Sequence, residues 1–197
     1  MNPLLSILTP AIPERLEQVR ALSAEIENQI GTRPVEHLVL MDNRRRSIGL
    51  KRDALLRAAG GDFVAFVDDD DWVSIHYIQE LLHFCKKATA DVITFRQEAT
   101  IDGALGTIEF RLGNPNQYFA PGVTRKRNAW HVCAWSRRLA IQSSFPDSNY
   151  GEDWAYAAKL CALPGLRESH IPKVLHYYKF DSCKSRAKKP ELTHAKI

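Results

Sequence analysis

The sequence predicts an α/β domain with a mostly parallel central sheet and helices on both faces. Two observations carry this prediction. Short apolar runs alternate with segments in which apolar residues recur every three or four positions, as strands alternate with helices in a parallel sheet. Three of the runs end in polar or acidic residues, and ligands of such a sheet bind beyond the C-terminal ends of its strands.

The first strand is expected at residues 4–8, an apolar run that Thr9-Pro10 stops. Pro13 suits the first turn of a helix and Gly31 suits its C-terminal end. Apolar spacing places the inward face of this helix at Leu16, Val19, Leu22, Ile26 and Ile30. Further strands are predicted at 37–41, 63–67 and 92–95, the first two of them buried, with helices at 48–59 and 75–85 between the strands.

The third of these helices is expected to start at Ser74, because a serine side chain can accept hydrogen bonds from the first N–H groups of a helix. Its inward face is predicted to hold Ile75, Ile78, Leu81, Leu82 and Cys85.

After residue 96 the alternation is lost. Asp102-Gly103 predicts a hairpin turn before a short strand at 107–111, and residues 113–130 are expected to form irregular loops. A brief strand is predicted at 132–135, a helix at 154–163 with Trp154, Ala158 and Cys161 inward, a late strand at 173–180 and a basic tail at 181–197.

The composition favours a single domain, because 197 residues with 45% hydrophobic content can bury a core. We find no leader pattern and no apolar run near the roughly 20 residues that cross a bilayer. The cysteines are far apart, at positions 85, 133, 161 and 183. This spacing argues against a zinc site or a disulfide framework and favours reduced thiols, so we expect a cytoplasmic protein.

The net charge of +4 is unevenly distributed along the chain. Acids concentrate at 68–71 and 152–153, and basic residues cluster at 44–46, 51–52, 125–127, 137–138 and 184–189. Such segregation suits a polyanionic partner, either a diphosphate ligand or a nucleic-acid backbone. For any single cluster, solvated surface charge is the plainer alternative.

Four carboxylates, Asp68 to Asp71, directly follow the predicted strand at 63–67. Two unit charges 4 Å apart repel by about 4 kcal/mol near a protein surface, so this run needs a counter-ion. A hard divalent cation, with a phosphorylated ligand completing its shell, is the natural one. The alternative is a plain acidic loop that leads into the next helix.

Common nucleotide-binding motifs are absent, since the chain has neither G-x-G-x-x-G nor a P-loop. The motifs that are present resemble, in order over residues 4 to about 180, those of family 2 glycosyltransferases with the GT-A fold. The D-x-D motif is matched at 67–71 and G-E-D-W at 151–154, and further matches lie at 6–10, 38–43 and 47–53. A lone D-x-D is weak, but the pair in this order is specific.

The resemblance implies a single Rossmann-like GT-A domain at 1–180. Residues 1–96 would be the half that binds a nucleotide-sugar, most simply a UDP-sugar, and 97–180 the acceptor-side half. It places donor contacts at Thr9, Pro10, Asp42, Arg52, Asp68 and Asp69. For Arg52, which would pair with the diphosphate, a helix-surface arginine is the alternative.

The resemblance also implies a Mn²⁺ or Mg²⁺ ion held by Asp70, with Asp68 near the metal and the ribose. In an extended backbone the side chains of Asp68 and Asp70 point the same way, so both can face one ligand. His176 is a candidate third ligand, with a plain strand histidine as the alternative.

For the chemical step, the resemblance assigns the base of an inverting transfer to Asp153, with Glu152 supporting acceptor contacts. Such a transfer needs a base, because the acceptor hydroxyl must lose its proton as it attacks the anomeric carbon. The alternative is an acid pair stabilised by the positive end of a helix.

The acceptor is less well defined by the sequence. Basic residues interleave with aromatic ones at 125–138, as in nucleic-acid binding, so we expect contacts from Arg127, His131 and Trp135. Trp135 could equally be a core residue, and we expect Trp72 and Trp154 to pack in the core. A 5-hydroxymethylpyrimidine in DNA, as in phage-type DNA glucosylation, is the specific hypothesis. A surface-polysaccharide acceptor, a non-catalytic binding module and a metal-dependent nuclease stay open.

Overall fold

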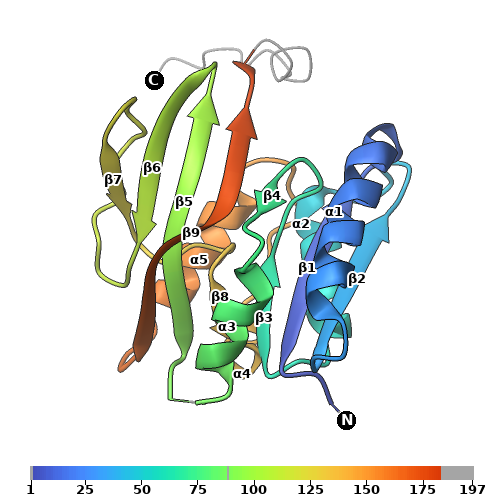
Figure 1. Ribbon diagram of the computed structural model, residues 1–197, viewed down its shortest axis with the longest axis horizontal. Coiled ribbons are helices and arrows are strands. Elements are labelled where there is room, and N and C mark those ends of the chain that lie inside the picture. The colour runs from blue at the N-terminus through green and yellow to red at the C-terminus, as the bar shows by residue number, and fades with distance from the viewer. Residues whose placement is uncertain (1, 88, 183–197) are drawn as a thin grey trace.

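The computed structural model describes residues 2–87 and 89–182, so almost all of the predicted tail at 181–197 lies outside the described residues. Its centre is a nine-stranded sheet, and the predicted α/β domain is confirmed (Figure 1). The strand order is β2-β1-β3-β8-β5-β6-β7, and β9 pairs with both β5 and β4. The sheet is mixed, because β8 runs antiparallel to both of its neighbours, β3 and β5.

The first half of the chain follows the predicted alternation. Its elements are β1 (Leu5–Ala11), a 3-10 turn (Pro13–Arg15), α1 (Leu16–Ile30), β2 (Val35–Met41), α2 (Ile48–Ala58), β3 (Phe63–Phe66), β4 (Trp72–Val73), α3 (Tyr77–Cys85) and β5 (Val92–Ile101). The second half contains β6 (Ala104–Phe110), β7 (Thr124–Arg127), β8 (Ala134–Ser136), α4 (Arg137–Ala140), α5 (Glu152–Cys161) and β9 (Glu168–Phe180).

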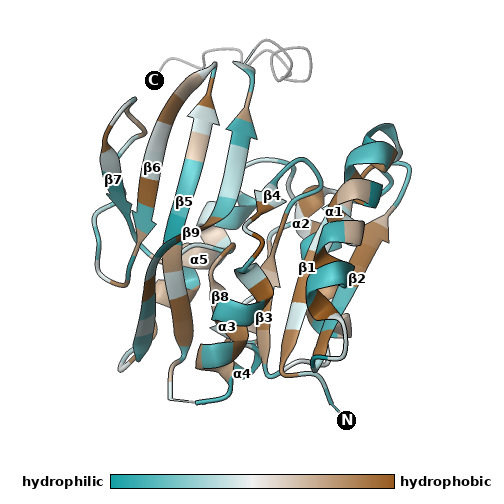
Figure 2. Cartoon of the chain, in the orientation of Figure 1, coloured by the Kyte–Doolittle hydropathy of each residue, from teal (hydrophilic) through white to brown (hydrophobic). Residues whose placement is uncertain are grey.

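The core lies around β1 and β3, whose residues are all buried. Figure 2 shows these two strands in the hydrophobic colours, while α1 turns a hydrophilic face outward. β2 was predicted to be a buried strand, but it forms the edge of the sheet and Val39 is 39% exposed. An apolar strand sequence does not distinguish an edge position from a central one, because that depends on which strand pairs with it.

The helices cover both faces of the sheet, as predicted. α1 packs against α3 on one face, and α2 packs against α5 on the other. In the strands of the first half, β1 runs parallel to both β2 and β3, so the ends of these strands reach one edge. The polar residues that follow them therefore meet there, as the sequence indicated.

Three helices differ from their predictions, and in α1 the difference is confined to Leu16, which was predicted to face inward but is exposed. Ser74 does not cap α3, which begins at Tyr77, because Trp72–Val73 pairs with β9 and keeps the chain extended. Ile75 is consequently 72% exposed. In α5 the buried side is formed by Glu152, Tyr156, Ala157 and Leu160, whereas Trp154 and Ala158 are exposed.

The second half is more regular than expected. The turn at Asp102-Gly103 is confirmed, and both residues have positive φ (50° and 81°), as a two-residue hairpin of this kind requires. The 113–130 segment was predicted to be irregular, yet it contributes β7 to the sheet edge. None of the helices in the described part of the chain has both the length and the apolar character needed to span a bilayer.

Candidate active site

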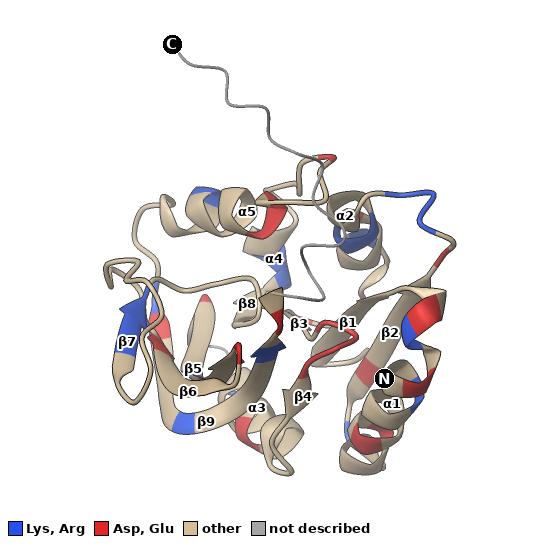
Figure 3. Cartoon of the chain, turned by 90° about the horizontal axis from the view of Figure 1, so that it is seen from above, with Lys and Arg blue, Asp and Glu red and all other residues tan. Residues whose placement is uncertain are grey.

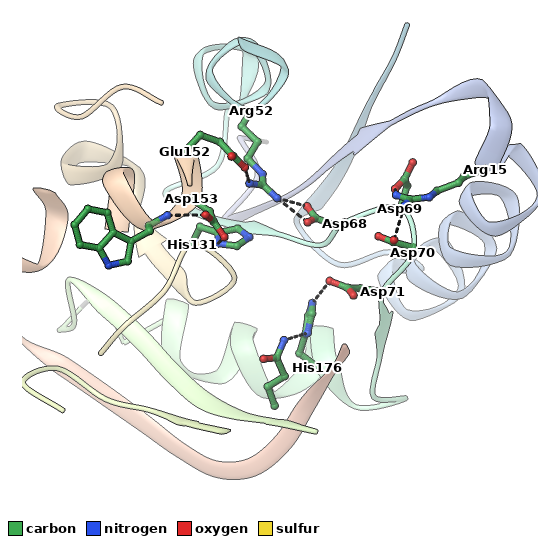
Figure 4. Close-up of polar contacts among 12 residues, drawn as sticks. Arg15, Arg52, Asp68, Asp69, Asp70, Asp71, His131, Glu152, Asp153 and His176 are labelled. Carbon is green, nitrogen blue, oxygen red and sulfur yellow. Dashed lines mark hydrogen bonds and ion pairs between the residues drawn. The ribbon is translucent and has the colours of Figure 1, made fainter. Parts of the chain in front are cut away.

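The four acids form a turn that follows β3 at the edge where the strand ends meet. The N–H of Asp71 donates to the carbonyl oxygen of Asp68 at 3.1 Å, which closes the turn. Seen from above, this acidic segment crosses the middle of the molecule, and a basic loop lies beside α2 (Figure 3). The four side chains diverge from the turn, and each has a different set of partners (Figure 4).

Asp68 is held by Arg52 of α2, whose guanidinium donates to both carboxylate oxygens at 2.7 and 2.6 Å. The same guanidinium bonds Glu152 at the start of α5. Arg52 is only 2% exposed. Because Asp68 and Glu152 lie 84 residues apart in the sequence, its two bonds connect the first half of the chain to the second. The pairing of Arg52 with a diphosphate remains a prediction, whereas the alternative of a helix-surface arginine is wrong, because the side chain is buried.

Asp69 and Asp70 share one partner that sequence reasoning missed. Arg15 bonds Asp69 at 2.5 Å and Asp70 at 2.7 Å, and the N–H of Ile12 donates to the second oxygen of Asp69 at 3.0 Å. Asp69 is buried at 3% exposure, whereas the side chain of Asp70 is 40% exposed. The position of Arg15 in the turn after β1, at the shared strand edge, is the signal that could have identified it.

Asp71 faces His176 of β9, with 3.4 Å between its carboxylate and Nε2 of the ring. The side-chain amide of Gln97 lies 2.9 Å from Nδ1 of the same ring. Burial lowers the pKa of His176 to about 4, so the ring is neutral at pH 7. These are the contacts of a buried strand histidine, and a role for His176 as a metal ligand remains only a prediction.

The first cavity beside the acids, of about 400 Å³, is strongly basic, and we call it the arginine cavity. Its walls include Pro10, Arg15, Arg44, Arg46, Lys51 and Asp69. Lys51 is 4% exposed and bonds Asp42 at 2.9 Å and the carbonyl oxygen of Ala11 at 2.8 Å. Asp42 thus lies next to this cavity, where a nucleoside contact was predicted.

Thr9 does not reach the arginine cavity. It is fully buried, and its hydroxyl lies 3.0 Å from Nε2 of His37 on the neighbouring strand β2. Its predicted contact with a donor is wrong because the side chain is fully buried against His37, whereas the next two residues, Pro10 and Ala11, line the cavity.

The second cavity, of about 450 Å³, contains Asp153 and is called the Asp153 cavity. It is also lined by Arg52, Asp68, Asp71, Arg127 and His131, and it shares Ile48 and Asn149 with the arginine cavity. The side chain of Asp153 is 30% exposed, with one oxygen 3.8 Å from Nδ1 of His131. The first two cavities therefore adjoin at Ile48 and Asn149, and the acid run contributes Asp69 to the first and Asp68 and Asp71 to the second.

His131 is a buried ring whose two nitrogens have no hydrogen-bond partner among the described residues. Burial, together with the nearby Arg52, lowers its pKa to about 4, against the pull of Asp153 and Asp68. A neutral imidazole thus faces Asp153. Glu152, in contrast, is occupied by Arg52, and burial raises its pKa.

The predicted acceptor residues separate into two groups. Arg127 and His131 line the Asp153 cavity, together with Trp130, which the sequence reasoning did not select. Trp135 is 1% exposed and its indole N–H donates to the carbonyl oxygen of Trp130 at 2.9 Å. The expectation that Trp135 contacts an acceptor is wrong, and its alternative as a core residue holds.

Asp68 and Asp70 are the candidate ligands of a divalent cation, but the expectation that they point the same way is wrong, because the chain turns here instead of staying extended (Figure 4). Burial raises the pKa of Asp70 to about 6, and the neighbouring Asp68 and Asp69 add to the rise against the pull of Arg15. In residues 2–87 and 89–182 no group of three or more His, Cys, Asp or Glu side chains is arranged to hold a metal. Two carboxylates suffice for an ion such as Mg²⁺, because phosphate oxygens and water complete its shell.

Comparisons with known proteins agree with this geometry. A family model described as glycosyl transferase family 2 matches residues 20–146. No match is found among curated proteins.

Solved structures of TarS from S. aureus share the fold. TarS 1-349 in complex with UDP is 18% identical with a TM-score of 0.61, and the match covers 89% of this chain and 60% of that one. The complex with UDP-GlcNAc is 14% identical with a TM-score of 0.59, covering 98% and 61%. A longer TarS structure is 15% identical with a TM-score of 0.59, covering 89% and 36%. The chain therefore spans about three-fifths of the shorter TarS structures and about a third of the longer one.

Proposed function

We propose that this chain, which belongs to glycosyl transferase family 2, transfers a sugar from a nucleotide-sugar to an acceptor hydroxyl with inversion at the anomeric carbon. The observation that carries the proposal is the junction of the two cavities. A basic cavity suited to a diphosphate adjoins a second one that contains the partly exposed carboxylate of Asp153, and the acid run lines both.

The donor occupies the arginine cavity. Arg15, Arg44, Arg46 and Lys51 supply the positive charge that a diphosphate requires, and Asp42, which pairs with Lys51 of this cavity, would contact the base of the nucleoside. UDP is the nucleotide we propose, and the TarS complexes with UDP and UDP-GlcNAc support it. Asp70 and Asp68 would hold Mn²⁺ or Mg²⁺, which when bound neutralises charge on the diphosphate leaving group.

Asp153 acts as the base. Its carboxylate takes the proton of the acceptor hydroxyl while the hydroxyl oxygen forms a bond to the anomeric carbon, and the bond from that carbon to the diphosphate breaks. Arg52 ties Glu152 to Asp68, which keeps the start of α5 close to the acid run. Asp153 follows Glu152 directly, so this link also sets the position of the base.

The acceptor has two candidates. A 5-hydroxymethylpyrimidine in DNA is supported by the basic strand β7 and by Arg127 and Trp130 in the Asp153 cavity. The DNA candidate loses support from Trp135, which is buried, and from Arg138, which pairs with Asp91 at 3.1 Å near the start of β5. A saccharide acceptor needs no row of basic side chains to bind a phosphate backbone, and we favour this candidate. A cytoplasmic location remains a prediction.

The test is a screen of UDP-sugars with Mn²⁺ against oligosaccharides, hydroxymethylated DNA and unmodified DNA, read by the mass of the product. We expect one acceptor to gain one sugar, and chelation of the metal to abolish the gain. Turnover that survives Asp70→Ala unchanged would favour a non-catalytic binding module with a contaminating activity. DNA cleavage with Mg²⁺ and no donor would instead reveal a nuclease.

A further inference from the structure

A third cavity, of about 360 Å³, lies on the far side of the acid run, and we call it the Trp72 cavity. It opens between α1, which contributes Gln18, and the antiparallel pair of β4 and β9, which contributes Trp72 and Tyr177. Asp70 also lines it, so it begins at the acids.

Trp72 is the unusual feature of this cavity. Sequence reasoning expected it in the core, but it is 42% exposed. It lies directly opposite Tyr177 in the β4–β9 pair, and Tyr178 also lines the cavity. One exposed and two partly buried aromatic residues, together with amide, hydroxyl and carboxylate groups, suit a ligand that is apolar on its faces and polar at its edges, as a sugar ring is.

The acidic side chains that line the cavity disfavour the binding of a polyanion. Its acidic side chains are Asp70, Asp71 and Glu98, and the one basic side chain among its lining residues is Lys179. A phosphodiester backbone would meet like charge here, which disfavours binding. A neutral saccharide meets no such penalty, and carboxylates accept hydrogen bonds from its hydroxyls.

The Trp72 cavity adjoins the site of the reaction. Asp71 and Tyr178 line both this cavity and the Asp153 cavity. A ligand that occupies both would place one unit against Trp72 and the next one beside Asp153.

We propose that the Trp72 cavity binds a sugar unit of a neutral oligosaccharide acceptor whose reacting hydroxyl points into the Asp153 cavity. This inference rests on the proposed function. It names the acceptor class as a saccharide of at least two units, and it assigns Trp72 and Gln18 to acceptor binding.

The experiment measures binding of the full chain, with UDP and Mn²⁺, to an array of neutral oligosaccharides and to hydroxymethylated duplex DNA. The best glycan is then titrated by calorimetry. We expect Trp72→Ala to weaken its affinity at least tenfold, Trp72→Phe to retain most of it, and Gln18→Ala to lower it several-fold. Tyr118→Ala is the matched control, because Tyr118 is 91% exposed and lines none of the three cavities.

Affinity for the glycan that is unchanged in Trp72→Ala would overturn the inference, as would binding of DNA in place of any neutral glycan, or binding of neither. UDP-sugar hydrolysis by the unaltered chain is measured in parallel, and it distinguishes failure of this inference from failure of the proposed function. Hydrolysis without glycan binding overturns this inference alone, whereas absence of both hydrolysis and transfer overturns the proposed function.

Discussion

At the scale of single residues, the site depends on ion pairs between largely buried side chains. Arg52 serves two carboxylates, Asp68 and Glu152, that come from distant parts of the chain. Such a network is costly to break, because the removal of one partner leaves the others charged and buried. The sequence motifs indicated which residue types gather here, but not that the arginine would bind acids of the protein itself.

Replacing Arg52 tests this network. We expect Arg52→Gln to lower the free energy of unfolding by about 3–5 kcal/mol, since two buried carboxylates lose their partner. Urea denaturation is the measurement. Arg57, on the same helix, is the control, because its pair with Asp53 at 2.8 Å leaves the arginine side chain 62% exposed. Arg57→Gln should change the free energy by no more than about 0.5 kcal/mol. Equal effects of the two variants would contradict the account.

His37 provides a test by pH. Burial lowers its pKa to about 4, so the histidine takes up its proton mainly on unfolding and destabilises the fold as the pH falls below 6.5. His37→Gln removes this penalty. The stability of the variant relative to the unaltered chain should therefore rise on acidification from pH 6.5 towards 4, by up to about 1.4 kcal/mol per pH unit. Urea midpoints across this range measure it, with His83→Gln, an exposed site, as the control. A difference that does not vary with pH would refute the assignment.

At the scale of elements, the alternation of strand and helix was readable because each strand in the first half is a short apolar run between turn residues. The second half was harder to predict. The chain from Trp72 to Ser74 stays extended because β9 pairs with it, and β9 lies about 100 residues later in the sequence. The inward side of α5 is likewise set by Arg52 and by the stacked pair of Phe145 and Tyr156, contacts that no local pattern contains.

Gly49 in α2 gives a prediction for the junction of the cavities. A Cβ atom at this position would come within 1.9 Å of the carbonyl oxygen of Pro146, and the N–H of Gly49 donates to Ser148 at 3.0 Å. We expect Gly49→Ala to displace this loop, lower the free energy of unfolding by about 1–3 kcal/mol and weaken UDP binding.

Gly60→Ala is the matched control, because its Cβ would meet only ordinary contacts at 3.4 Å or more. That change should be neutral or stabilise the chain by up to about 1 kcal/mol. Thermal melting measures the stability of both variants, and calorimetry measures their affinity for UDP. A Gly49→Ala variant as stable as Gly60→Ala would show that the loop does not hold the helix.

At the scale of the whole molecule, the acids lie where three cavities meet, and each cavity takes a different part of the proposed reaction. The motifs predicted this convergence, since parallel strands bring their ends to one edge. Burial decided the rest. Thr9 and Trp135 are buried and cannot contact a ligand, whereas Trp72 is exposed. These differences depend on tertiary neighbours rather than on residue type.

The most direct test of the central claim compares turnover and UDP affinity in Asp153→Asn. With the best UDP-sugar and acceptor pair, kcat should fall at least about 100-fold, the loss expected for a general base. The dissociation constant for UDP should stay within about twofold, because Asp153 lies outside the arginine cavity. Glu17→Gln, on the exposed face of α1, should behave like the unaltered chain. Full turnover by Asp153→Asn, or equal losses of turnover and UDP affinity, would contradict the account.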